Sequence, residues 1–525
     1  MEPSALSLLP PVVLIALAIL TRRILLSLGV GIALGALLSN QWDVPASARM
    51  LAGIAGEIFY AEGEVSEEAY ILVFVVMLGV LTTFIFVSGG LRAFAEAAVR
   101  KVRTRFQAQL VPIVLGIIIF FDDAFSSLVG GNVSRTITDR HRISRAKLSY
   151  FVDSTAAPVI VLTPISGWAV FIATTMTAIF ADNGVTTYTG YQAYLFSVPA
   201  NLYAITAILF VFAVAYFRLD IGPMRRWERR AVNDGVVTGP GDGPVPGEAD
   251  RNLAVRDDGK VADLVVPVLT LIGVTVVGTV WIGVAETDGA VTPAQILANT
   301  NVILALFFGG LLAVLLAGAR LLMRRTPAGQ VGRAGLSGIR SMLMAAAVLF
   351  CAWVTAEIMS ELGIGEYLAG LIGGGLATAL LPALVFVMAS CISFSIGSTF
   401  GTFGLLLPIV AEIALSVSPG LLIPMFGAVL AGAIFGDHTS PLSDTTILAS
   451  IGSGIHLIDH VTTQLPYALV CGVASVVGYV ILGLTGNVVL GLLAAVAALA
   501  VFVFLLRSLS RPVTEAVATP DPHGT

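Results

Sequence analysis

The sequence has little charge, because only 12 % of its 525 residues are Asp, Glu, Lys or Arg, whereas 57 % are hydrophobic. The mean hydropathy of +0.94 lies above the range of water-soluble globular domains. A net charge of -5 also argues against nucleic-acid binding. The composition therefore indicates a polytopic membrane protein whose partners are the lipid bilayer and small solutes, with no nucleic acid among them.

Cysteine is scarce as well. Cys351, Cys391 and Cys471 each lie in an apolar run, and their spacing is not that of metal ligands. We expect them to be packing residues. The sequence has no HExxH motif, which argues against a zinc protease. No cofactor is expected.

Apolar stretches recur along the whole chain. A helix needs ~20 apolar residues to cross the ~30 Å hydrocarbon core of a bilayer, and about eleven stretches meet this need. Their length predicts an all-α protein. The expected spans are residues 5–20, 24–40, 70–88, 148–181, 193–217, 262–284, 298–320, 341–360, 421–453, 464–484 and 486–506.

Basic residues gather between these spans, and acidic or neutral segments alternate with them along the chain. Because Lys and Arg are concentrated on the cytoplasmic side of membrane proteins, the basic clusters fix the orientation. We expect a multi-pass protein of the cell membrane with its N-terminus outside and its C-terminus in the cytoplasm. The clusters lie in residues 22–23, 92–105, 135–147, 218–230 and 320–340.

Two apolar stretches do not fit a simple crossing. Residues 109–132 lie between two basic clusters that are both expected in the cytoplasm, so this stretch is predicted to enter the membrane and turn back at "FDDAFSSLVGG". Residues 381–416, with "SFSIGSTFGTFG", are predicted to form a second re-entrant hairpin from the opposite side. Such hairpins occur where the turn is buried in protein or lines a cavity.

The two halves of the chain repeat the same order of motifs. The first half has "FDDAFSSLVGG" and then "DSTAAP", and the second has "FSIGSTFGTFG" and then "DHTSP". The basic clusters give the halves opposite orientations, which predicts inverted repeats with broken helices, as in many secondary transporters. The expected parts are a two-helix segment with an external loop (1–69), repeat 1 (70–217), a flexible cytoplasmic linker (218–262), connecting helices (263–340), repeat 2 (341–484), and a last helix with a cytoplasmic tail (485–525).

Five aspartates lie in the predicted spans and hairpins, where a charged side chain costs about 2.5–3.5 kcal/mol at a helix centre. Each stands near Gly, Ser, Thr or Pro. Hard cations prefer carboxylate, hydroxyl and carbonyl oxygens, and a broken helix adds free carbonyls. A carboxylate that binds either a proton or a metal cation is sufficient for antiport. The five are Asp122, Asp123, Asp153, Asp437 and Asp444.

The predicted site extends to the polar residues around these aspartates. Na+ is expected at Asp437, at Asp444 and at one of the two adjacent aspartates of the first hairpin. The structural alternatives are a polar network that caps a kinked helix for the group around Asp437, a hairpin tip at the surface for that pair, helix capping near Asp153, and packing at the second hairpin. The predicted ion- and proton-binding residues are Asp122, Asp123, Ser126, Ser127, Asp153, Ser154, Thr155, Ser398, Thr399, Asp437, His438, Thr439, Ser440, Asp444 and Thr445.

Two other histidines, His456 and His460, lie in the short polar stretch "GIHLIDHVTTQ". There a solvated helix face is expected. His438 has no second histidine near it in the sequence, so a transition-metal site is not expected there. For His438 a hydrogen-bonding or proton-relay role and a structural role are equally compatible with the sequence.

The stretches "FFDDAFSSLVGGNVSRTITDRHRISRAKLSYFVDSTAAPV" and "GAIFGDHTSPLSDTTILAS" resemble the signature regions of the NhaC family of Na+/H+ antiporters. The resemblance covers roughly residues 70–480, and "GDHTSPLSDTT" is its most specific part. It implies sodium-proton exchange and the ion transporter superfamily fold, which has two inverted repeats, each with a re-entrant hairpin. The family also includes members similar to malate/lactate exchangers.

The leading hypothesis is therefore a Na+/H+ antiporter that works by alternating access, and a homodimer is compatible with it. The alternative is a Na+- or H+-coupled exchanger of small carboxylates or amino acids. Because no Lys or Arg lies in the hairpin turns or beside Asp437, the sequence favours a cation. A remote alternative is an intramembrane aspartyl protease, in which two carboxylates share one proton. The inverted repeats and hairpins argue against it, so no enzyme is expected.

Overall fold

The computed structural model describes residues 5–21, 23–61, 63–90, 92–94, 102–120, 122–239, 255–286, 301–362 and 376–509. In these ranges nearly all regular structure is helical, and two short strands, β1 (Tyr60–Ala61) and β2 (Glu64–Val65), pair antiparallel. Ten described helices are long and apolar enough to cross a membrane, or up to 12 if each bent pair is one span. The predicted all-α polytopic fold is confirmed.

The N-terminal segment contains more helix than the sequence suggested. After η1 (Ala5–Leu8) come α1 (Leu9–Thr21) and α2 (Ile24–Ser39), and then a third helix, α3 (Val44–Glu57), bends away from α2 by 120°. A capped start favours α3, because the Asp43 side chain accepts a hydrogen bond from the backbone N–H of Ala46 at 3.2 Å. The expected external loop is therefore partly helical.

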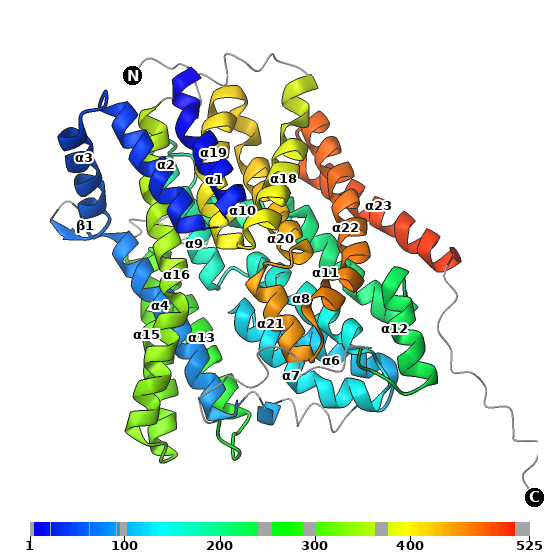
Figure 1. Ribbon diagram of the computed structural model, residues 1–525. Coiled ribbons are helices and arrows are strands. Elements are labelled where there is room, and N and C mark those ends of the chain that lie inside the picture. Colours follow the sequence, from blue (N-terminus) through cyan, green and yellow to red (C-terminus); the bar gives the residue numbers. More distant parts are fainter. Residues whose placement is uncertain are drawn as a thin grey trace, which may run out of the picture.

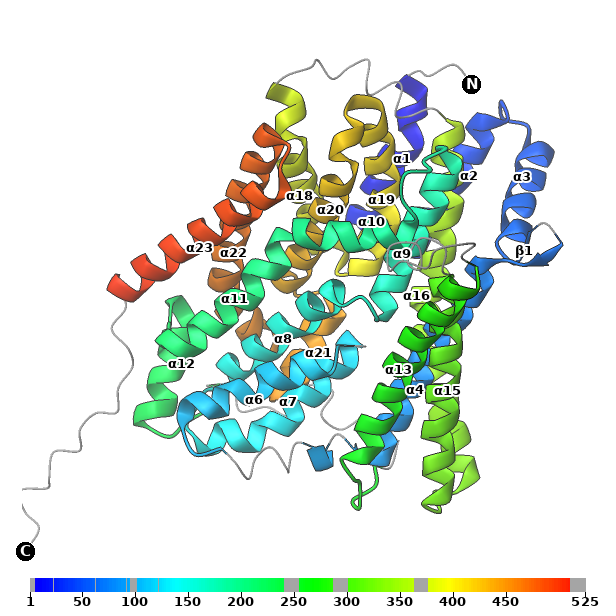
Figure 2. The same ribbon diagram turned by 180° about the vertical axis from the view of Figure 1, so that it is seen from behind.

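Four helices lie side by side at one flank of the molecule, on the left of Figure 1 and on the right of Figure 2. They pack closely where glycines meet, since a Cβ added to Gly79 would lie 2.4 Å from the carbonyl oxygen of Gly338. The predicted boundary between the connecting helices and repeat 2, at residues 340 and 341, falls inside the longest of these four helices. The four are α4 (Glu67–Ser88), α13 (Ala262–Ala285), α15 (Val302–Met323) and α16 (Ala328–Glu361).

The first half of the chain contains a helical hairpin and a broken helix. The hairpin is α6 (Arg105–Ile118) and α7 (Asp123–Arg140), and the predicted span 148–181 consists of α8 (Arg145–Leu162) and α9 (Gly167–Asp182), bent by 42°. The helix breaks at Pro164, because proline has no N–H to donate to a helical hydrogen bond. Next come α10 (Gly190–Ser197), η2 (Val198–Ala200) and α11 (Leu202–Phe217).

The second half repeats this order. The hairpin α18 (Leu376–Ile396) and α19 (Thr399–Val417) precedes η3 (Pro419–Leu421) and a second broken helix, which consists of α20 (Leu422–Thr439) and α21 (Asp444–Ser453). The two breaks have similar sequences, "TPIS" at 163–166 and "SPLS" at 440–443. The last described helices are α22 (Leu457–Thr485) and α23 (Val488–Leu509).

The positions of the breaks correct one detail of the predicted repeat. "DSTAAP" and "DHTSP" are not equivalent, because Asp153 lies about three turns before its break and Asp437 about one turn before its own. Pro158 lies within α8 and does not end it. The apparent match of these two motifs is therefore a chance likeness beside a real structural repeat.

The predicted flexible linker, residues 218–262, contains an ordered helix. This helix, α12 (Gly222–Asn233), buries Trp227 and Glu228 against the helices around it. Buried Lys147 lies 2.6 Å from an oxygen of Asp220, just before α12, and 3.7 Å from Glu228, which also pairs with Arg105. These ion pairs hold α12 in place. The Gly/Pro-rich residues 240–254 lie outside the described residues, as do the tail 510–525 and residues 363–375.

Helix α20 crosses α18 at short distance. A Cβ added to Gly436 would lie 2.4 Å from the carbonyl oxygen of Ser390, so larger residues do not fit there. Beside this crossing the hydroxyl of Ser393 donates to the carbonyl of Ala433 at 2.6 Å. Small residues and hydroxyls of this kind join helices inside membranes. The end of α20 that carries Asp437 is therefore held rigidly against the second hairpin.

Candidate ion-binding site

Two half-helices begin with an aspartate, α7 with Asp123 and α21 with Asp444. The helices pack against each other, and a Cβ added to Gly131 of α7 would lie 2.6 Å from the backbone of Gly452 in α21. The first turn of a helix favours a negative charge, because its N–H groups are unpaired. The fold thus places two carboxylates from distant parts of the chain at neighbouring helix starts.

Asp437 lies in the last turn of α20 and its side chain is fully buried. The hydroxyl of Thr445 donates to Oδ2 of Asp437 at 2.7 Å, and the hydroxyl of Ser443 lies 2.9 Å from that of Thr445. Oδ1 of Asp437 has no hydrogen-bond partner among the described residues. One oxygen of a buried carboxylate is therefore available for a proton or a cation.

The first hairpin brings its aspartates close to Asp437. The charges of Asp437 and Asp444 both act on Asp123. Asp444 is exposed, Asp123 is half-buried, and Asp122 is buried like Asp437. The carboxylates thus differ in burial, and their mutual repulsion favours a shared cation or protons.

Asp153 belongs to a separate network. It is fully buried, and its Oδ2 accepts hydrogen bonds from Thr446 at 3.1 Å and from Gln464 at 2.6 Å. The same oxygen lies 3.2 Å from Nε2 of His460. These partners occupy Oδ2, so Asp153 differs from Asp437 in its surroundings. The hydroxyl of Thr446 also lies 3.3 Å from the backbone carbonyl of Asp437 and joins the two centres.

His438 is buried beside Asp437 and is held by α11. Its Nδ1 lies 3.1 Å from the hydroxyl of Tyr203, and the two rings meet edge to face. Its backbone carbonyl accepts a hydrogen bond from Gln464 at 2.9 Å. His438 therefore fixes the end of α20 between α11 and α22.

Several predicted hydroxyls serve the backbone. Those of Thr439 and Thr155 donate to carbonyls of their own helices, and that of Ser440 donates to Phe394 of α18 at 2.7 Å. Ser398 caps α19 by accepting from the N–H of Gly401. These side chains therefore form hydrogen bonds within a helix, between helices or at a helix start. The other predicted hydroxyl residues are buried, namely Ser126, Ser127, Ser154 and Thr399.

Sequence reasoning missed part of the site and misplaced His460. The expectation of a solvated face was wrong for this residue, which is fully buried against α8, whereas His456 is half-buried. A signal was present, because His456, His460 and Gln464 follow at intervals of four and so share one helix face. Thr446, Ser443 and Tyr203 also contribute contacts that the sequence did not indicate.

The predicted sodium ligands do not form a closed cage of side chains. In the described part of the chain, no group of three or more His, Cys, Asp or Glu residues is arranged to hold a metal ion. Sodium at Asp437 therefore requires oxygens of other kinds, such as hydroxyls or water, beside the carboxylates.

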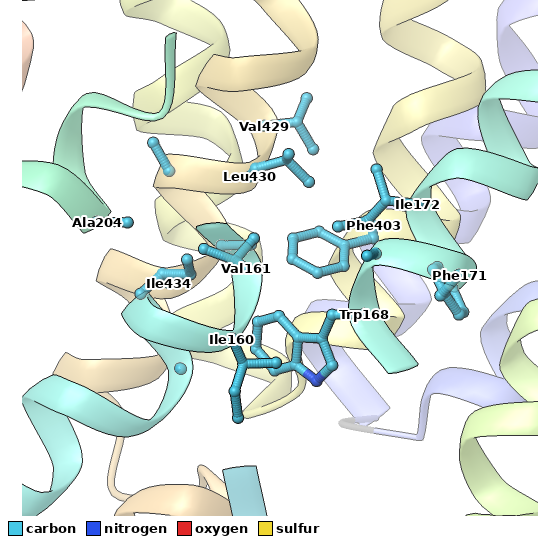
Figure 3. Packing of buried hydrophobic residues seen from close by; sticks show 14 of the residues in the cluster. Ile160, Val161, Trp168, Phe171, Ile172, Ala204, Phe403, Val429, Leu430 and Ile434 are labelled. Atoms are coloured by element: carbon cyan, nitrogen blue, oxygen red, sulfur yellow. The ribbon is translucent and has the colours of Figure 1, made fainter. Parts of the chain in front are cut away.

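An apolar layer fills the other side of the broken helices. Trp168 of α9 meets Phe400 and Phe403 of α19 edge to face, with ring centroids 5.4 and 5.5 Å apart. Figure 3 shows Trp168 below Phe403 in a cluster of apolar residues that also includes Val161 and, beside it, Ile434 of α20. Ile434 lies one turn before Asp437, on the side of η3. The apolar cluster therefore lies beside the same helix, α20, that carries Asp437.

The comparisons with known proteins agree with this architecture. Residues 159–484 match the sequence model of the Na+/H+ antiporter family. An uncharacterised protein of Haemophilus influenzae is 37 % identical over 505 residues, which is 95 % of each chain. The YdaH transporter of Alcanivorax borkumensis has a TM-score of 0.55 at 14 % identity, over 90 % of each chain. At that identity the likeness concerns the fold alone.

Shorter stretches match other antiporters. The arginine/ornithine antiporter ArcD of Halobacterium salinarum is 40 % identical over 110 residues, 20 % of this chain and 22 % of that one. The malate-2H+/Na+-lactate antiporter of Bacillus subtilis is 31 % identical over 130 residues, 22 % and 27 % of the chains. The Na+/H+ antiporter NhaC of Alkalihalophilus pseudofirmus is 33 % identical over 105 residues, 20 % and 22 % of the chains.

Proposed function

Because the chain belongs to the Na+/H+ antiporter family, it is a secondary transporter, and we propose that it exchanges Na+ for H+ across the cell membrane by alternating access. The resemblance to NhaC read from its motifs is confirmed at the level of the family. The observation that carries the proposal is the buried carboxylate of Asp437. One of its oxygens has no hydrogen-bond partner among the described residues, and it interacts electrostatically with Asp123 and Asp444.

The competition of H+ and Na+ follows from the burial of the Asp437 carboxylate. A carboxylate removed from water is strongly destabilised unless a proton or a cation neutralises it. Asp437 thus holds either H+ or Na+, and the two ions exclude each other at this oxygen. Thr445 supports the ionised form by donating to Oδ2. Asp444 and Asp123 attract Na+ toward Asp437, while the apolar cluster around Trp168 and Phe403 offers a cation no polar partner.

The site favours a cation over an anion. Helix starts are anion-binding positions, but α7 and α21 begin with Asp123 and Asp444, which repel an anion. Among the described residues, the carboxylate of Asp437 accepts a hydrogen bond from the hydroxyl of Thr445, and no Lys or Arg forms an ion pair with it. The electrostatics of these two helix starts therefore oppose a carboxylate cargo.

A second candidate is an exchanger of amino acids or small carboxylates. It is favoured by the partial matches to the arginine/ornithine and malate/lactate antiporters. The starts of α9 and α19 carry no acidic residue and are capped by Ser166 and Ser398. A cationic amino acid would place its positive group at Asp437 and its carboxylate at one of these starts.

Proton flux in proteoliposomes tests the proposal. The purified protein is reconstituted with an internal pH-sensitive dye, and Na+, Li+, K+, arginine, ornithine and malate are added in turn across a preset pH gradient. We expect Na+ to collapse the gradient, and Asp437→Asn to abolish the response while the protein still elutes as a folded species. A gradient that arginine or malate collapses, and Na+ alone does not, would establish the second candidate.

A further inference from the structure

Three polar side chains follow one another at intervals of one turn at the start of helix α22. His456 is half-buried just before the helix, His460 is fully buried in its first turn, and Gln464 is buried one turn further in. Their spacing of four places them on one face. This face leads from the short turn at residues 454–456, between α21 and α22, to Asp153, and its side chains become more buried from His456 to Gln464.

Gln464 and Thr446 both bridge Asp153 to the broken end of α20. Nε2 of Gln464 donates to Asp153 at 2.6 Å and to the carbonyl of His438 at 2.9 Å. The hydroxyl of Thr446 lies 3.1 Å from Asp153 and 3.3 Å from the carbonyl of Asp437. A change of charge at Asp153 is therefore transmitted to the helix end that positions Asp437.

Polar atoms at this network remain unpaired among the described residues. They are Oδ1 of Asp153, Nδ1 of His460, Oε1 of Gln464 and Nε2 of His438, and all four side chains are at least nine-tenths buried. Buried polar atoms without a partner cost free energy. Oδ1 of Asp153 and Nδ1 of His460 are therefore positions at which a proton can be added without breaking a hydrogen bond between described residues.

We propose that the Asp153–His460 pair is a second proton-binding site of the transport cycle, distinct from Asp437, and that exchange therefore moves two protons for each Na+. His460 takes up the proton on its imidazole ring, which makes the pair an electrically neutral ion pair in the protein interior. Na+ replaces the proton of Asp437 without changing the net charge at that carboxylate. The accompanying shift of the end of α20 reaches Asp153 through Thr446 and Gln464, so that His460 releases its proton as well. The inference rests on the proposed sodium-proton exchange.

The charges around His460 support this coupling. Asp153 on α8 faces it directly, and His438 on α20 interacts with both residues of the pair. The charges of Asp437 and Asp444 act on one another and on Asp153. On α22 itself Asp459 precedes His460 and His456 lies one turn earlier, while Arg145 binds the carbonyl of Gly454 in the preceding turn at 3.3 Å.

The test variant is His460→Gln, because glutamine keeps an N–H donor for Asp153 but does not bind a proton. The adjacent Asp459→Asn is the matched control. Each protein is reconstituted with the membrane potential clamped at zero, and the Na+ ratio that just stops net flux is measured against a series of H+ ratios. Wild type and the control are expected to balance when the Na+ ratio equals the square of the H+ ratio. His460→Gln is expected to balance at equal ratios.

The outcomes separate the two proposals. A wild type that balances at equal ratios, or a His460→Gln variant that keeps the squared relation, overturns the second proton site but leaves sodium-proton exchange in place. A wild type with no Na+-driven H+ flux removes the proposed function and the inference with it. If His460→Gln does not transport, the efflux of radioactive Na+ from vesicles with the wild-type protein is measured instead, to test whether the cycle moves two protons for each Na+. Acceleration by an inside-negative potential supports the two-proton cycle, and its absence overturns it.

Discussion

Replacing Thr445 with valine tests how the Thr445 hydroxyl affects the balance between the protonated and ionised forms of Asp437. Valine has nearly the shape of threonine but lacks the hydroxyl that donates to Asp437 Oδ2 at 2.7 Å. A hydrogen bond to a charged group contributes about 1.5–3 kcal/mol. Because this bond stabilises the ionised carboxylate, its loss favours the protonated form. At about 1.4 kcal/mol per pH unit, half-maximal Na+ transport should move upward by about one to two pH units.

The assay is the initial rate of Na+-driven proton flux in proteoliposomes as a function of pH. Thr445→Ser is the control, since it keeps the hydroxyl and should show the wild-type profile. The maximal rate of Thr445→Val at high pH should approach that of the wild type, because the carboxylate itself is intact. A Thr445→Val profile that coincides with the wild type, or that moves to lower pH, would refute the role assigned to this hydroxyl.

Two further predictions concern the helices that hold the site. Gly436→Ala should destabilise the protein by about 1–3 kcal/mol, because the new Cβ would lie 2.4 Å from the Ser390 carbonyl. Gly273→Ala, with open space around it, should leave the melting temperature in detergent unchanged or slightly raised. Lys147→Met leaves Asp220 unpaired in the interior and should cost about 3–5 kcal/mol. Arg92→Met, which breaks an exposed pair, should cost under about 1 kcal/mol. Equal melting temperatures for Lys147→Met and Arg92→Met would contradict the assignment of α12 as a fixed element.

Local signals in the sequence predicted the architecture. Apolar length predicted the spans, and basic clusters on both sides of an apolar stretch predicted the first hairpin. The location of the helix breaks was less accessible, because Pro158 and Pro164 look alike in sequence, yet α8 continues through the first and ends before the second. A proline inside a membrane helix is tolerated when neighbouring groups satisfy the freed carbonyls, and this depends on tertiary contacts.

The candidate site, too, was predictable only in part from the sequence. Its aspartates were found because a charge in an apolar span is conspicuous. The partner of Asp153 was not found, because His460 is 307 residues away and lies in a stretch whose composition is typical of a solvated helix face. Likewise, the inverted repeat predicts equivalent backbones but not equivalent chemistry, since Asp444 and Asp123 begin α21 and α7 where Gly167 and Thr399 begin α9 and α19.

The central claim, that Na+ and H+ compete for the carboxylate of Asp437, is tested most directly by proton release on Na+ binding. Na+ is added to the purified protein in weakly buffered detergent solution, with choline as the control cation, and the pH change and bound Na+ are recorded together. Wild type should acidify the solution as Na+ binds, with weaker binding at lower pH, and Asp437→Asn should neither bind Na+ nor release protons. Na+ binding without proton release, or unchanged release by Asp437→Asn, would contradict the account.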